Sequence, residues 1–367
     1  MKILYVEPFY AGAHKQWIDN LKFFSKHKFT ILSLPGRKWK WRMHGGAITL
    51  AYEFNQLDEK FDLIICSDML NLAVFKELCN TNLHSSKVVV YFHENQLSYP
   101  WSPHDKDKVL NRDFHYYYIN YTTSLISDYN FFNSNYQYDS YFYELKRYLN
   151  KMPDYRNLDT INKIKNKSSV LHIGCNLGIE NKISKINSTP IVLWNHRWEY
   201  DKGPDDFFNI LYKIKKVGVK FLLVILGEKY TEYPNCFKVA QDKLKDELLF
   251  IGYCKSNKEY KSWLRKADVI PVTSIQDFFG ISIVEAIACN TYPILPNRLA
   301  YPEIMNLDSN PEIFYNSKNE LYNKLLNFLK NYKTLRHSCM KYSSIANQYD
   351  WVNMVEKYDN TFERIYK

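Results

Sequence analysis

Short apolar runs that alternate with helix-like segments are the feature that most constrains how this chain folds. The pattern restarts after polar stretches rich in Lys and Asn, at 157–168 and 181–189. Regular alternation of strands and helices is typical of parallel sheets that helices cover on both faces. The sequence therefore predicts an α/β protein with two doubly wound sheets. The expected strands span 2–6, 29–34, 62–66, 88–92 and 130–134, then 190–194, 220–226, 247–251, 268–272 and 292–295.

The same restart predicts the domain organisation. At 367 residues the chain has the length of two ordinary domains. We expect an N-terminal domain over 1–180 and a C-terminal domain over 188–348. The segment 349–367 is expected to form a helix that packs back onto the N-terminal domain. Because ligands of doubly wound sheets bind at the carboxyl ends of the strands, functional residues are expected there.

Charge and cysteine usage narrow the class of protein. The net charge of +10 favours a polyanionic partner or a phosphorylated substrate, with a merely basic surface as the alternative. The start MKILYVEPFY does not have the pattern of a signal peptide, and no run is long enough to span a membrane. The seven cysteines lie far apart without a C-x-x-C motif, so neither disulfides nor a zinc site are expected. We therefore expect a cytoplasmic protein without integral membrane association.

The stretch QDFFGISIVEAIACNTYPI, at 276–294, is the most specific in the sequence. It leads from an expected strand through a glycine turn into a helix, with Asp277 and Glu285 at D-x(7)-E spacing. The positive end of that helix attracts a phosphate, and a carboxylate one turn further in can accept both hydroxyls of a ribose. The alternative is an ordinary loop before a helix that happens to carry a Glu. The backbone N–H groups expected at the helix start belong to Phe279, Gly280, Ile281 and Ser282.

A second candidate segment, WNHRWEYDKGPDDF at 194–207, follows the first strand of the second domain. It places Arg197 and Lys202 across a tight loop. Arg offers a planar fork of donors and Lys a point charge, a combination suited to a diphosphate. A solvated pair of cations is the alternative.

The segment PGRKWKWRMH, at 35–44, alternates aromatic and basic side chains. In an extended conformation the tryptophans would share one side and the cations the other. Such a surface suits both the stacking of RNA bases and contact with phosphates. The alternative is that the tryptophans are buried beneath the loop. The candidate acceptor-binding residues here are Lys38, Trp39, Lys40, Trp41 and Arg42.

Polar residues also follow two expected strands of the first domain. His93 and Glu94 come after the strand 88–92, where side chains meet reacting hydroxyls, although a histidine that braces the loop is an alternative. His14 lies at the first strand-to-helix turn, and Gly12 allows a ligand to approach the backbone there. The motif DKD at 105–107 mimics a metal-binding D-x-D motif but lacks a strand before it, so no metal is expected.

The two donor-like segments resemble family 4 retaining glycosyltransferases, which have the GT-B fold of two Rossmann-like domains. Their usual signature is E-x(7)-E, and Asp277 replaces its first Glu. The resemblance implies that Arg197 and Lys202 neutralise the diphosphate of a sugar nucleotide without a metal, and that Glu285 holds the ribose. It further implies that the loop 278–281 lines the donor sugar, that Tyr253 lies near the base, and that His93 lies near the reacting groups.

A narrower resemblance spans both domains. Seven segments together resemble the tRNA-queuosine α-mannosyltransferase family. This resemblance implies transfer of mannose from GDP-mannose to the cyclopentenediol of queuosine in the anticodon of tRNA-Asp, without a cofactor. It extends the acceptor-binding set to Gly12, His14, Glu94 and Asn95. The segments are EPFYAGAHKQ (7–16), LPGRKWKWR (34–42), YFHENQLSYP (91–100), FNSNY (132–136), NHRWEYDK (195–202), DFFGISIVEA (277–286) and YPEI (301–304).

Two other functions stay open at this point. A glycosyltransferase of the same fold could act on a lipid or cell-envelope saccharide, using its basic face to bind an anionic membrane. A non-catalytic RNA-binding relative could retain the fold without activity. The presence of Arg197, Lys202 and Glu285 argues against the non-catalytic alternative, and Asp277 is the one departure from the family signature.

Overall fold

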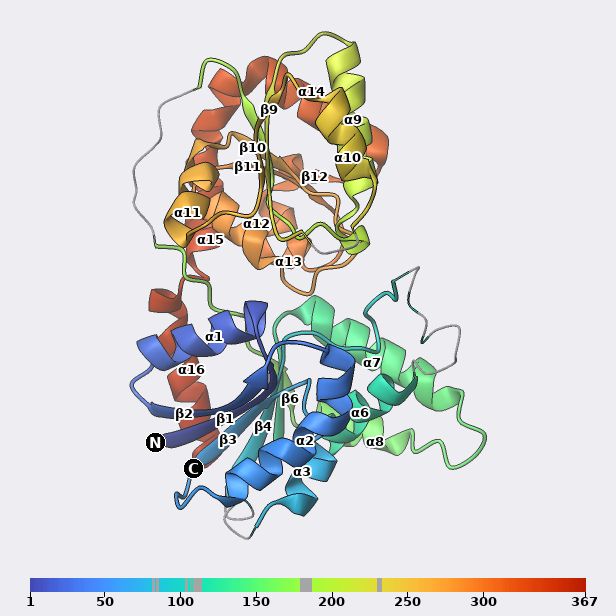
Figure 1. Cartoon of the computed structure of the whole chain (residues 1–367), viewed down its shortest axis with the longest axis vertical. Helices are drawn as coiled ribbons and strands as arrows, with labels where there is room; N and C mark the ends of the chain where they lie inside the picture. The colour runs from blue at the N-terminus through green and yellow to red at the C-terminus, as the bar shows by residue number, and fades with distance from the viewer. Residues whose placement is uncertain are drawn as a thin grey trace. The chain divides into compact units, whose positions relative to one another are not determined.

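The computed structural model describes residues 1–80, 83, 86–102, 105, 107, 114–178, 187–229 and 233–367. Most of the polar stretch expected at 181–189 lies outside the described residues. The chain divides into two compact units, Met1–Gly174 with Trp351–Lys367, and Cys175–Asp350 (Figure 1). In the described part, each unit contains a six-stranded sheet in which neighbouring strands run parallel. The predicted α/β class with two doubly wound sheets is therefore confirmed.

The sheet of the first unit has the strand order β2-β1-β3-β4-β5-β6. All five strands expected in this half of the sequence are present, because each is an apolar run that is buried in the sheet. The short strand β6 was missed because its sequence, SSV, has no apolar run. The strands are β1 (Lys2–Tyr10), β2 (Lys28–Pro35), β3 (Leu63–Ser67), β4 (Lys87–Phe92), β5 (Tyr129–Phe132) and β6 (Ser168–Val170).

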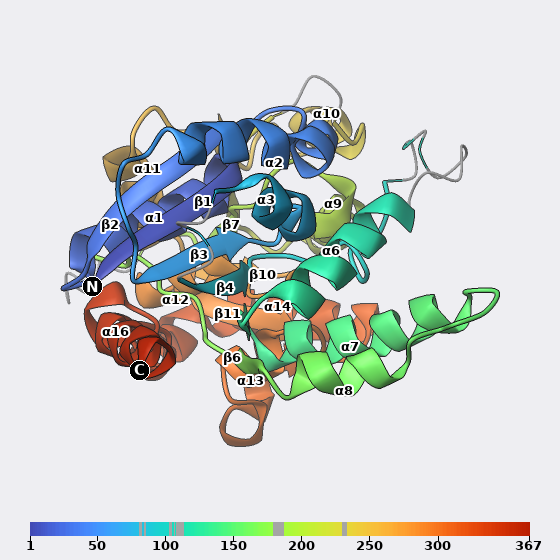
Figure 2. The same ribbon diagram turned by 90° about the horizontal axis from the view of Figure 1, so that it is seen from below.

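Helices cover both faces of this first sheet (Figure 2). On one face, alternate side chains of the strands, such as Val6, Ile64 and Val90, form a core with apolar residues of the helices that follow β2, β3, β4 and β5. These are the side chains that a period of two places on one side of each strand. The helices are α2 (Trp39–Asn55), α3 (Leu72–Leu78), α6 (Phe114–Ile126), α7 (Asn135–Asn150) and α8 (Asp159–Lys165).

The opposite face is covered by α1 (Gly12–Phe24) and by the last helix of the chain, α16 (Trp351–Tyr366). The buried indole of Trp17 stacks on Tyr91 of β4 with ring centroids 4.4 Å apart. Its Nε1–H donates a hydrogen bond of 3.1 Å to the hydroxyl of Tyr358 in α16. Segments from the two ends of the chain thus share one layer, and α1 and α16 lie side by side in both views (Figures 1 and 2).

The sheet of the second unit has the order β12-β11-β10-β7-β8-β9. Again all five expected strands are present, and the two-residue strand β12 was missed because so short an element leaves no pattern. The strands β7 and β10 are neighbours, and the chain continues outward from them in opposite directions. The strands are β7 (Ile191–Trp194), β8 (Leu222–Leu226), β9 (Leu248–Gly252), β10 (Val269–Pro271), β11 (Tyr292–Pro296) and β12 (Phe314–Tyr315).

The helices of the second unit begin where the sequence gives start signals. Pro204 occupies the first turn of α9, and the side chain of Ser256 accepts a hydrogen bond from the backbone N–H of Glu259 at the start of α11. None of the helices among the described residues combines the length and the apolar character needed to cross a membrane. The elements are η1 (Tyr200–Lys202), α9 (Pro204–Lys216), α10 (Cys236–Lys243), α11 (Asn257–Lys266), α12 (Ile281–Ala288), α13 (Tyr301–Ile304), η2 (Leu307–Ser309), η3 (Pro311–Ile313), α14 (Lys318–Leu335), η4 (Arg336–Ser338) and α15 (Cys339–Asn347).

One local prediction is wrong. The segment 35–44 was expected to be extended, but α2 begins at Trp39 after a left-handed residue, Lys38, with φ of 58°. At 100° per residue, positions 39 and 41 point to opposite sides of a helix. Accordingly Trp39 is half-buried whereas Trp41 is 64% exposed. The two tryptophans therefore do not share one side.

Candidate active site

The first group of candidate residues lies in the second unit, where the strand order reverses between β7 and β10. The loop after β7 carries Arg197 and Lys202, and the loop after β10 carries Asp277. The two loops meet, since Nζ of Lys202 lies 3.0 Å from Oδ1 of Asp277 and donates a 2.8 Å hydrogen bond to the carbonyl oxygen of Gln276. Ligands of doubly wound sheets bind at this reversal, so these residues stand at the expected position.

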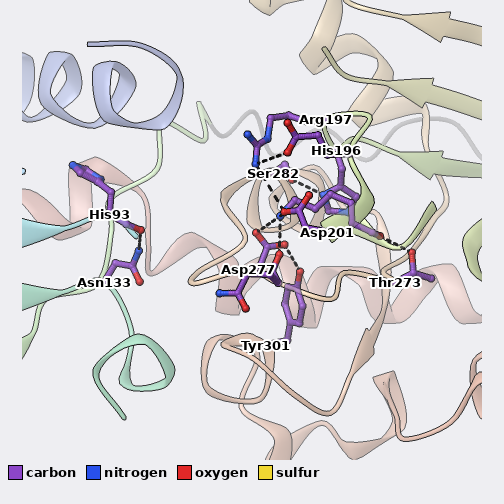
Figure 3. A network of polar contacts seen from close by, with 12 residues as sticks. His93, Asn133, His196, Arg197, Asp201, Thr273, Asp277, Ser282 and Tyr301 are labelled. Atoms are coloured by element: carbon purple, nitrogen blue, oxygen red, sulfur yellow. Dashed lines mark hydrogen bonds and ion pairs between the residues drawn. The ribbon is translucent and has the colours of Figure 1, made fainter. Parts of the chain in front are cut away.

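Gly203 explains how the two loops approach so closely. Its φ of 64° is in the left-handed region, and a Cβ placed there would lie 2.4 Å from the carbonyl oxygen of Thr273. The hydroxyl of Thr273 in turn donates a 3.0 Å hydrogen bond to the carbonyl oxygen of Lys202 (Figure 3). A glycine after Lys202 is therefore required to hold this lysine against the loop that carries Asp277.

Lys202 and Asp277 form a buried ion pair. Burial alone would lower the pKa of Lys202, but the carboxylates of Asp277 and Asp201 outweigh it and hold the pKa above its usual value. Burial likewise raises the pKa of Asp277, but Lys202 outweighs it and holds that pKa below its usual value. Nζ of Lys202 also lies 3.2 Å from Asp201. The lysine is thus a fixed, charged group at this edge of the sheet.

Arg197 complements this cation with a more accessible charge. Its side chain is 45% exposed, and its Nη2 lies 3.4 Å from a carboxylate oxygen of Glu199 and 3.9 Å from one of Asp201. In Figure 3, Arg197 lies on the side of Asp201 that is remote from Tyr301. The loop after β7 therefore presents one buried and one half-exposed cation, a suitable receptor for two linked phosphates.

Asp277 has a second partner that the sequence alone did not reveal. The hydroxyl of Tyr301, at the start of α13, donates a 2.6 Å hydrogen bond to its Oδ2. The ring of Tyr301 also lies against Gly280, where a Cβ would come within 2.9 Å of the ring. Each oxygen of Asp277 is thus bonded, and its carboxylate is held in one orientation. The only signal for Tyr301 in the sequence was its place in the segment YPEI.

The helix α12 begins where the D-x(7)-E motif predicted a helix. Gly280 caps it with φ of 91°, so that Ile281 and Ser282 provide first-turn N–H groups, which in any α-helix lack an intrahelical acceptor. His196 lies beside this turn, with Nδ1 3.4 Å from the hydroxyl of Ser282. Burial lowers the pKa of His196 to about 4, so the imidazole is neutral at pH 7. Sequence reasoning did not single out His196.

Glu285 and Tyr253 complete the expected donor side. Glu285 lies in α12, and its Oε2 accepts a 2.8 Å hydrogen bond from the hydroxyl of Tyr260 in α11. This tyrosine, which sequence reasoning also missed, fixes one oxygen of the carboxylate. Tyr253 follows β9 directly and is 74% exposed, so its ring is open to solvent at the same edge of the sheet.

The second group of candidates lies in the first unit, around a residue that sequence reasoning missed. Glu7, near the end of β1, is fully buried and accepts four hydrogen bonds. The donors are the hydroxyl of Tyr5 (2.8 Å), the backbone N–H of Phe9 (2.8 Å), the hydroxyl of Ser67 (2.9 Å) and Nδ1 of His14 (2.9 Å). Both oxygens of this carboxylate are therefore occupied. Its only signal was the segment EPFYAGAHKQ.

The Glu7 carboxylate determines the charge of His14. Burial alone would lower the pKa of His14, but Glu7 outweighs it and raises the pKa to about 9, so the imidazole is protonated at pH 7. The ring of His93 lies next to it, with centroids 4.2 Å apart. Burial and the charge of His14 hold the pKa of His93 well below its usual value. One charged and one neutral imidazole thus lie side by side.

A buried carboxyl group from the neighbouring strand completes this cluster. Asp68 follows β3, and its Oδ1 accepts a 2.8 Å hydrogen bond from the backbone N–H of His93. Burial raises the pKa of Asp68 to about 8. Because β1 and β3 are neighbours where this strand order reverses, the sheet itself brings Glu7, His14 and Asp68 together.

This cluster contains residue types that bind metals, but its histidine His14 carries a proton that a metal would have to displace. Among the described residues, one ligand atom each from Glu7, His14 and His93 lie within 4.8 Å of one another. Without a metal, Glu7 holds the proton on His14 and accepts four hydrogen bonds, so a metal would have to displace that proton and at least one of those donors. The geometry thus favours a hydrogen-bonded cluster, and the absence of a metal stays a prediction.

The other candidates of the first unit lie around the same strand ends. Gly12, with φ of 51°, begins α1. Asn95 is fully buried, and its Oδ1 accepts 2.9 Å hydrogen bonds from the N–H and the hydroxyl of Ser98, so this oxygen braces the loop after β4. Glu94 is half-buried and accepts a 2.9 Å hydrogen bond from Gln96.

The basic and aromatic residues around 35–44 separate into two groups. Trp39 packs on Tyr116 with ring centroids 5.1 Å apart, and Nζ of Lys40 lies 2.6 Å from carboxylate oxygens of both Asp105 and Asp107. The DKD motif therefore binds a lysine, although its middle residue, Lys106, lies outside the described residues. Lys38 and Trp41 are exposed and Arg42 is half-buried.

Known proteins with this fold are similar over the whole chain. Sucrose-phosphate synthase from Thermosynechococcus elongatus superposes with a TM-score of 0.75 at 13% identity, covering 100% of this chain and 99% of that one. The Anabaena protein Alr3699/HepE, solved in complex with UDP, gives a TM-score of 0.65 at 15% identity, covering 99% and 100% of the two chains. Together with the sheet-edge sites, these likenesses define the fold as GT-B.

Sequence comparisons identify the class and then the family. Residues 179–344 match the family model of group 1 glycosyl transferases, so the protein is a glycosyltransferase. Residues 2–175 match the model of the tRNA-queuosine alpha-mannosyltransferase N-terminal region. The tRNA-queuosine alpha-mannosyltransferase of Drosophila melanogaster is 33% identical over 378 aligned residues, covering 99% of this chain and 96% of that protein. The chain belongs to the tRNA-queuosine alpha-mannosyltransferase family.

Proposed function

We propose that the protein transfers mannose from GDP-mannose, with retention of configuration, to the cyclopentenediol of queuosine in the anticodon of tRNA-Asp. The observation that most supports this is the family membership along the whole chain. The donor-side geometry adds a chemical reason, since Arg197 and Lys202 lie at the edge where the sheet of the second unit binds ligands. We place the enzyme in the cytoplasm, together with its tRNA.

In this proposal the second unit stabilises the leaving group. The bond between the anomeric carbon and the diphosphate oxygen breaks, and negative charge grows on the diphosphate. Lys202 and Arg197 receive that charge without a metal, and the first turn of α12 adds N–H donors. Because the Lys202 ammonium is already fixed by Asp201 and Asp277, it needs no reorganisation during the reaction. His196, which lies beside Ser282 and is neutral, adds no further charge to this site.

The remaining donor contacts follow from the family resemblance. Glu285 would accept the ribose hydroxyls, Tyr253 would contact the guanine, and Asp277 and the loop 278–281 would contact the mannose. The acceptor hydroxyl then bonds to the anomeric carbon on the face that the diphosphate left, and its proton passes to the departing phosphate oxygen. His93, neutral and at a strand end of the first unit, would lie near that hydroxyl.

A labelling experiment tests the proposal. The protein is incubated with radiolabelled GDP-mannose and with bulk tRNA from cells that contain queuosine or from cells that lack it. We expect label only in the queuosine-containing tRNA, in a product that an α-mannosidase releases. Equal labelling of both tRNA pools, or of neither, would refute the proposed acceptor. Transfer from UDP-glucose in place of GDP-mannose would refute the proposed donor.

A further inference from the structure

A stripe of large apolar side chains runs along the solvent side of α2. It consists of Trp41, Ile48 and Tyr52, which are 64%, 58% and 69% exposed, with Gly45 between the first two. The spacing of four, three and four positions places these residues on one face of a helix. Contiguous exposed apolar surface of this kind marks an interaction site. We call Trp41, Gly45, Ile48 and Tyr52 the α2 stripe.

Gly45 determines how the indole of Trp41 is presented. A Cβ at Gly45 would lie 2.9 Å from Cζ2, 3.1 Å from Cε2 and 3.2 Å from Cη2 of Trp41. Three ring atoms at nearly equal distance mean that the ring lies flat over the backbone of Gly45, with its other face toward solvent. A glycine inside a helix destabilises it relative to alanine, and here the glycine makes room for a flat, exposed aromatic surface.

Trp39 and Lys40, two positions and one position before Trp41, do not share this property. The half-buried indole of Trp39 packs against a small core that includes Met43 and Tyr116. The ammonium group of Lys40 is paired with Asp105 and Asp107. Both side chains therefore contact other residues of the first unit and hold α2 in place. Of the three residues, Trp41 is the one that is exposed to a partner.

The charges around the α2 stripe indicate the chemistry of that partner. The sequence from Arg37 to Tyr52 contains four Lys or Arg residues and no Asp or Glu. Arg37 and Lys38 are exposed just before α2 begins. The same turn packs on the start of α1, because a Cβ at Gly36 would lie 2.0 Å from Cβ of Ala11. The cations therefore stand beside the start of α1, the helix that carries His14.

Flat aromatic surface next to exposed cations suits single-stranded RNA, since bases stack on the rings and phosphates pair with the cations. We infer that the α2 stripe, with Arg37 and Lys38, is a docking surface for the unpaired bases of an RNA loop, and that Trp41 is its central stacking residue. This inference rests on the proposed function, because a tRNA acceptor supplies such a loop. It goes further in assigning Trp41, Ile48 and Tyr52 to RNA and Trp39 and Lys40 to the fold.

RNA binding by matched variants tests this inference. The probe is a fluorescently labelled RNA stem-loop with a seven-base loop, titrated with the full chain and followed by anisotropy. Trp41→Ala is expected to weaken binding by roughly tenfold, as loss of one stacked base does, and Trp41→Phe should retain most of the affinity. The control is Tyr143→Ala, which removes a ring of similar exposure (66%) from α7. We expect no change with this control.

Salt dependence separates stacking from charge. Arg37→Gln should lower the slope of log K against log salt by about 0.7, the value for one phosphate contact in single strands. Trp41→Ala should leave that slope unchanged while lowering the affinity at every salt concentration. Circular dichroism spectra equal to that of the wild type show that both variants are folded, which is expected because both side chains lie in solvent.

Three outcomes would overturn the inference. One is an affinity of Trp41→Ala within twofold of the wild type. A second is a wild-type dimer that Trp41→Ala converts to monomer, which would make the stripe an interface between copies. A third is binding to anionic phospholipid vesicles that Trp41→Ala abolishes while RNA binding persists. If the wild type transfers mannose to queuosine tRNA but Trp41→Ala binds that tRNA normally, the proposed docking surface is refuted and the proposed function is not. If the wild type binds RNA through Trp41 but never transfers mannose, the proposed function is refuted and the proposed docking surface is not.

Discussion

The hydroxyl of Tyr301 donates a 2.6 Å hydrogen bond to Oδ2 of Asp277, whose Oδ1 is paired with Lys202 at 3.0 Å. The two partners hold both oxygens of a carboxylate that is one methylene shorter than the Glu of the family signature. A shorter side chain reaches less far from the loop, so the position of the Asp277 carboxylate depends on its hydrogen-bond partners. Tyr301 therefore acts as a positioning residue for Asp277.

Tyr301→Phe should lower turnover by about tenfold, the equivalent of about 1.4 kcal/mol, because one oxygen of Asp277 loses a charge-assisted hydrogen bond. The measurement is kcat and KM for mannose transfer. Tyr315→Phe is the control, since the Tyr315 hydroxyl donates a comparable 2.7 Å hydrogen bond to the backbone carbonyl of Val272. If both variants lose only stability and keep kcat, Tyr301 does not position Asp277.

Substitutions of Arg197 and Lys202 should both slow catalysis but should differ in their effect on stability. Arg197→Ala and Lys202→Met are each expected to slow transfer by a factor of 100 or more, as loss of a preorganised group worth about 3 kcal/mol does. Lys202→Met should also lower the melting temperature, because it leaves Asp201 and Asp277 buried without their cation. Arg197 is 45% exposed, so Arg197→Ala should melt like the wild type. Near-normal rates in both variants would refute the donor site.

The Glu7–His14 pair predicts how stability depends on pH. The pKa of His14 is about 9 in the folded chain and about 6.5 when unfolded, so the folded state binds the proton more tightly. The resulting stabilisation is complete below pH 6.5 and is lost as the pH rises through about 9; it amounts to about 3 kcal/mol at most. The raised pKa of Asp68 acts with the same sign below about pH 8.

Chemical denaturation between pH 6 and pH 9.5 measures this dependence. The wild type should lose stability as the pH rises, and Glu7→Gln should lose less, because His14 is then no longer held in its charged form. Parallel curves for the two proteins would show that the pair does not titrate in this range. Lys87→Gln, at an exposed position of β4, is a control that also changes one charge.

Chelation tests the prediction that no metal takes part. Dialysis against EDTA should leave the rate of mannose transfer unchanged, and elemental analysis of the active protein should find less than a tenth of an equivalent of zinc, manganese or magnesium. The reason is that His14 is protonated and both oxygens of Glu7 are occupied. Loss of activity that added metal restores would contradict this reading of the cluster.

The strands were predictable from sequence because they are buried apolar runs. Each of the ten expected strands overlaps a strand of the structure, whereas β6 and β12 are short and lie at the edges of their sheets. The helix α2 was not predicted, because its first residues alternate aromatic and basic side chains as a strand would. Gly45 and Gly46 also interrupt its helical pattern, and only the packing of Met43, Ala47 and Leu50 shows why it is a helix.

The candidate residues that stand in one local motif were predictable from the sequence. The residues that only the fold brings next to them were not. Arg197, Lys202, Asp277 and Glu285 stand in local motifs. Their partners come from distant positions: Tyr260 and Tyr301 are ordinary tyrosines in the sequence, and only the folded chain brings their hydroxyls to carboxylates. Glu7 stands just after the expected strand 2–6, and the sequence does not show that four donors would surround its carboxylate.

The place of α16 has a consequence for synthesis. Translation at about 5–20 residues per second separates Gly174 from Trp351 by roughly 10–35 s. Throughout that interval the indole of Trp17, which stacks on Tyr91, lacks its second partner, Tyr358, because α16 has not yet been made. A premature stop codon in the second unit would therefore release a first unit without α16. The apolar face that α16 covers would then be exposed and prone to aggregate.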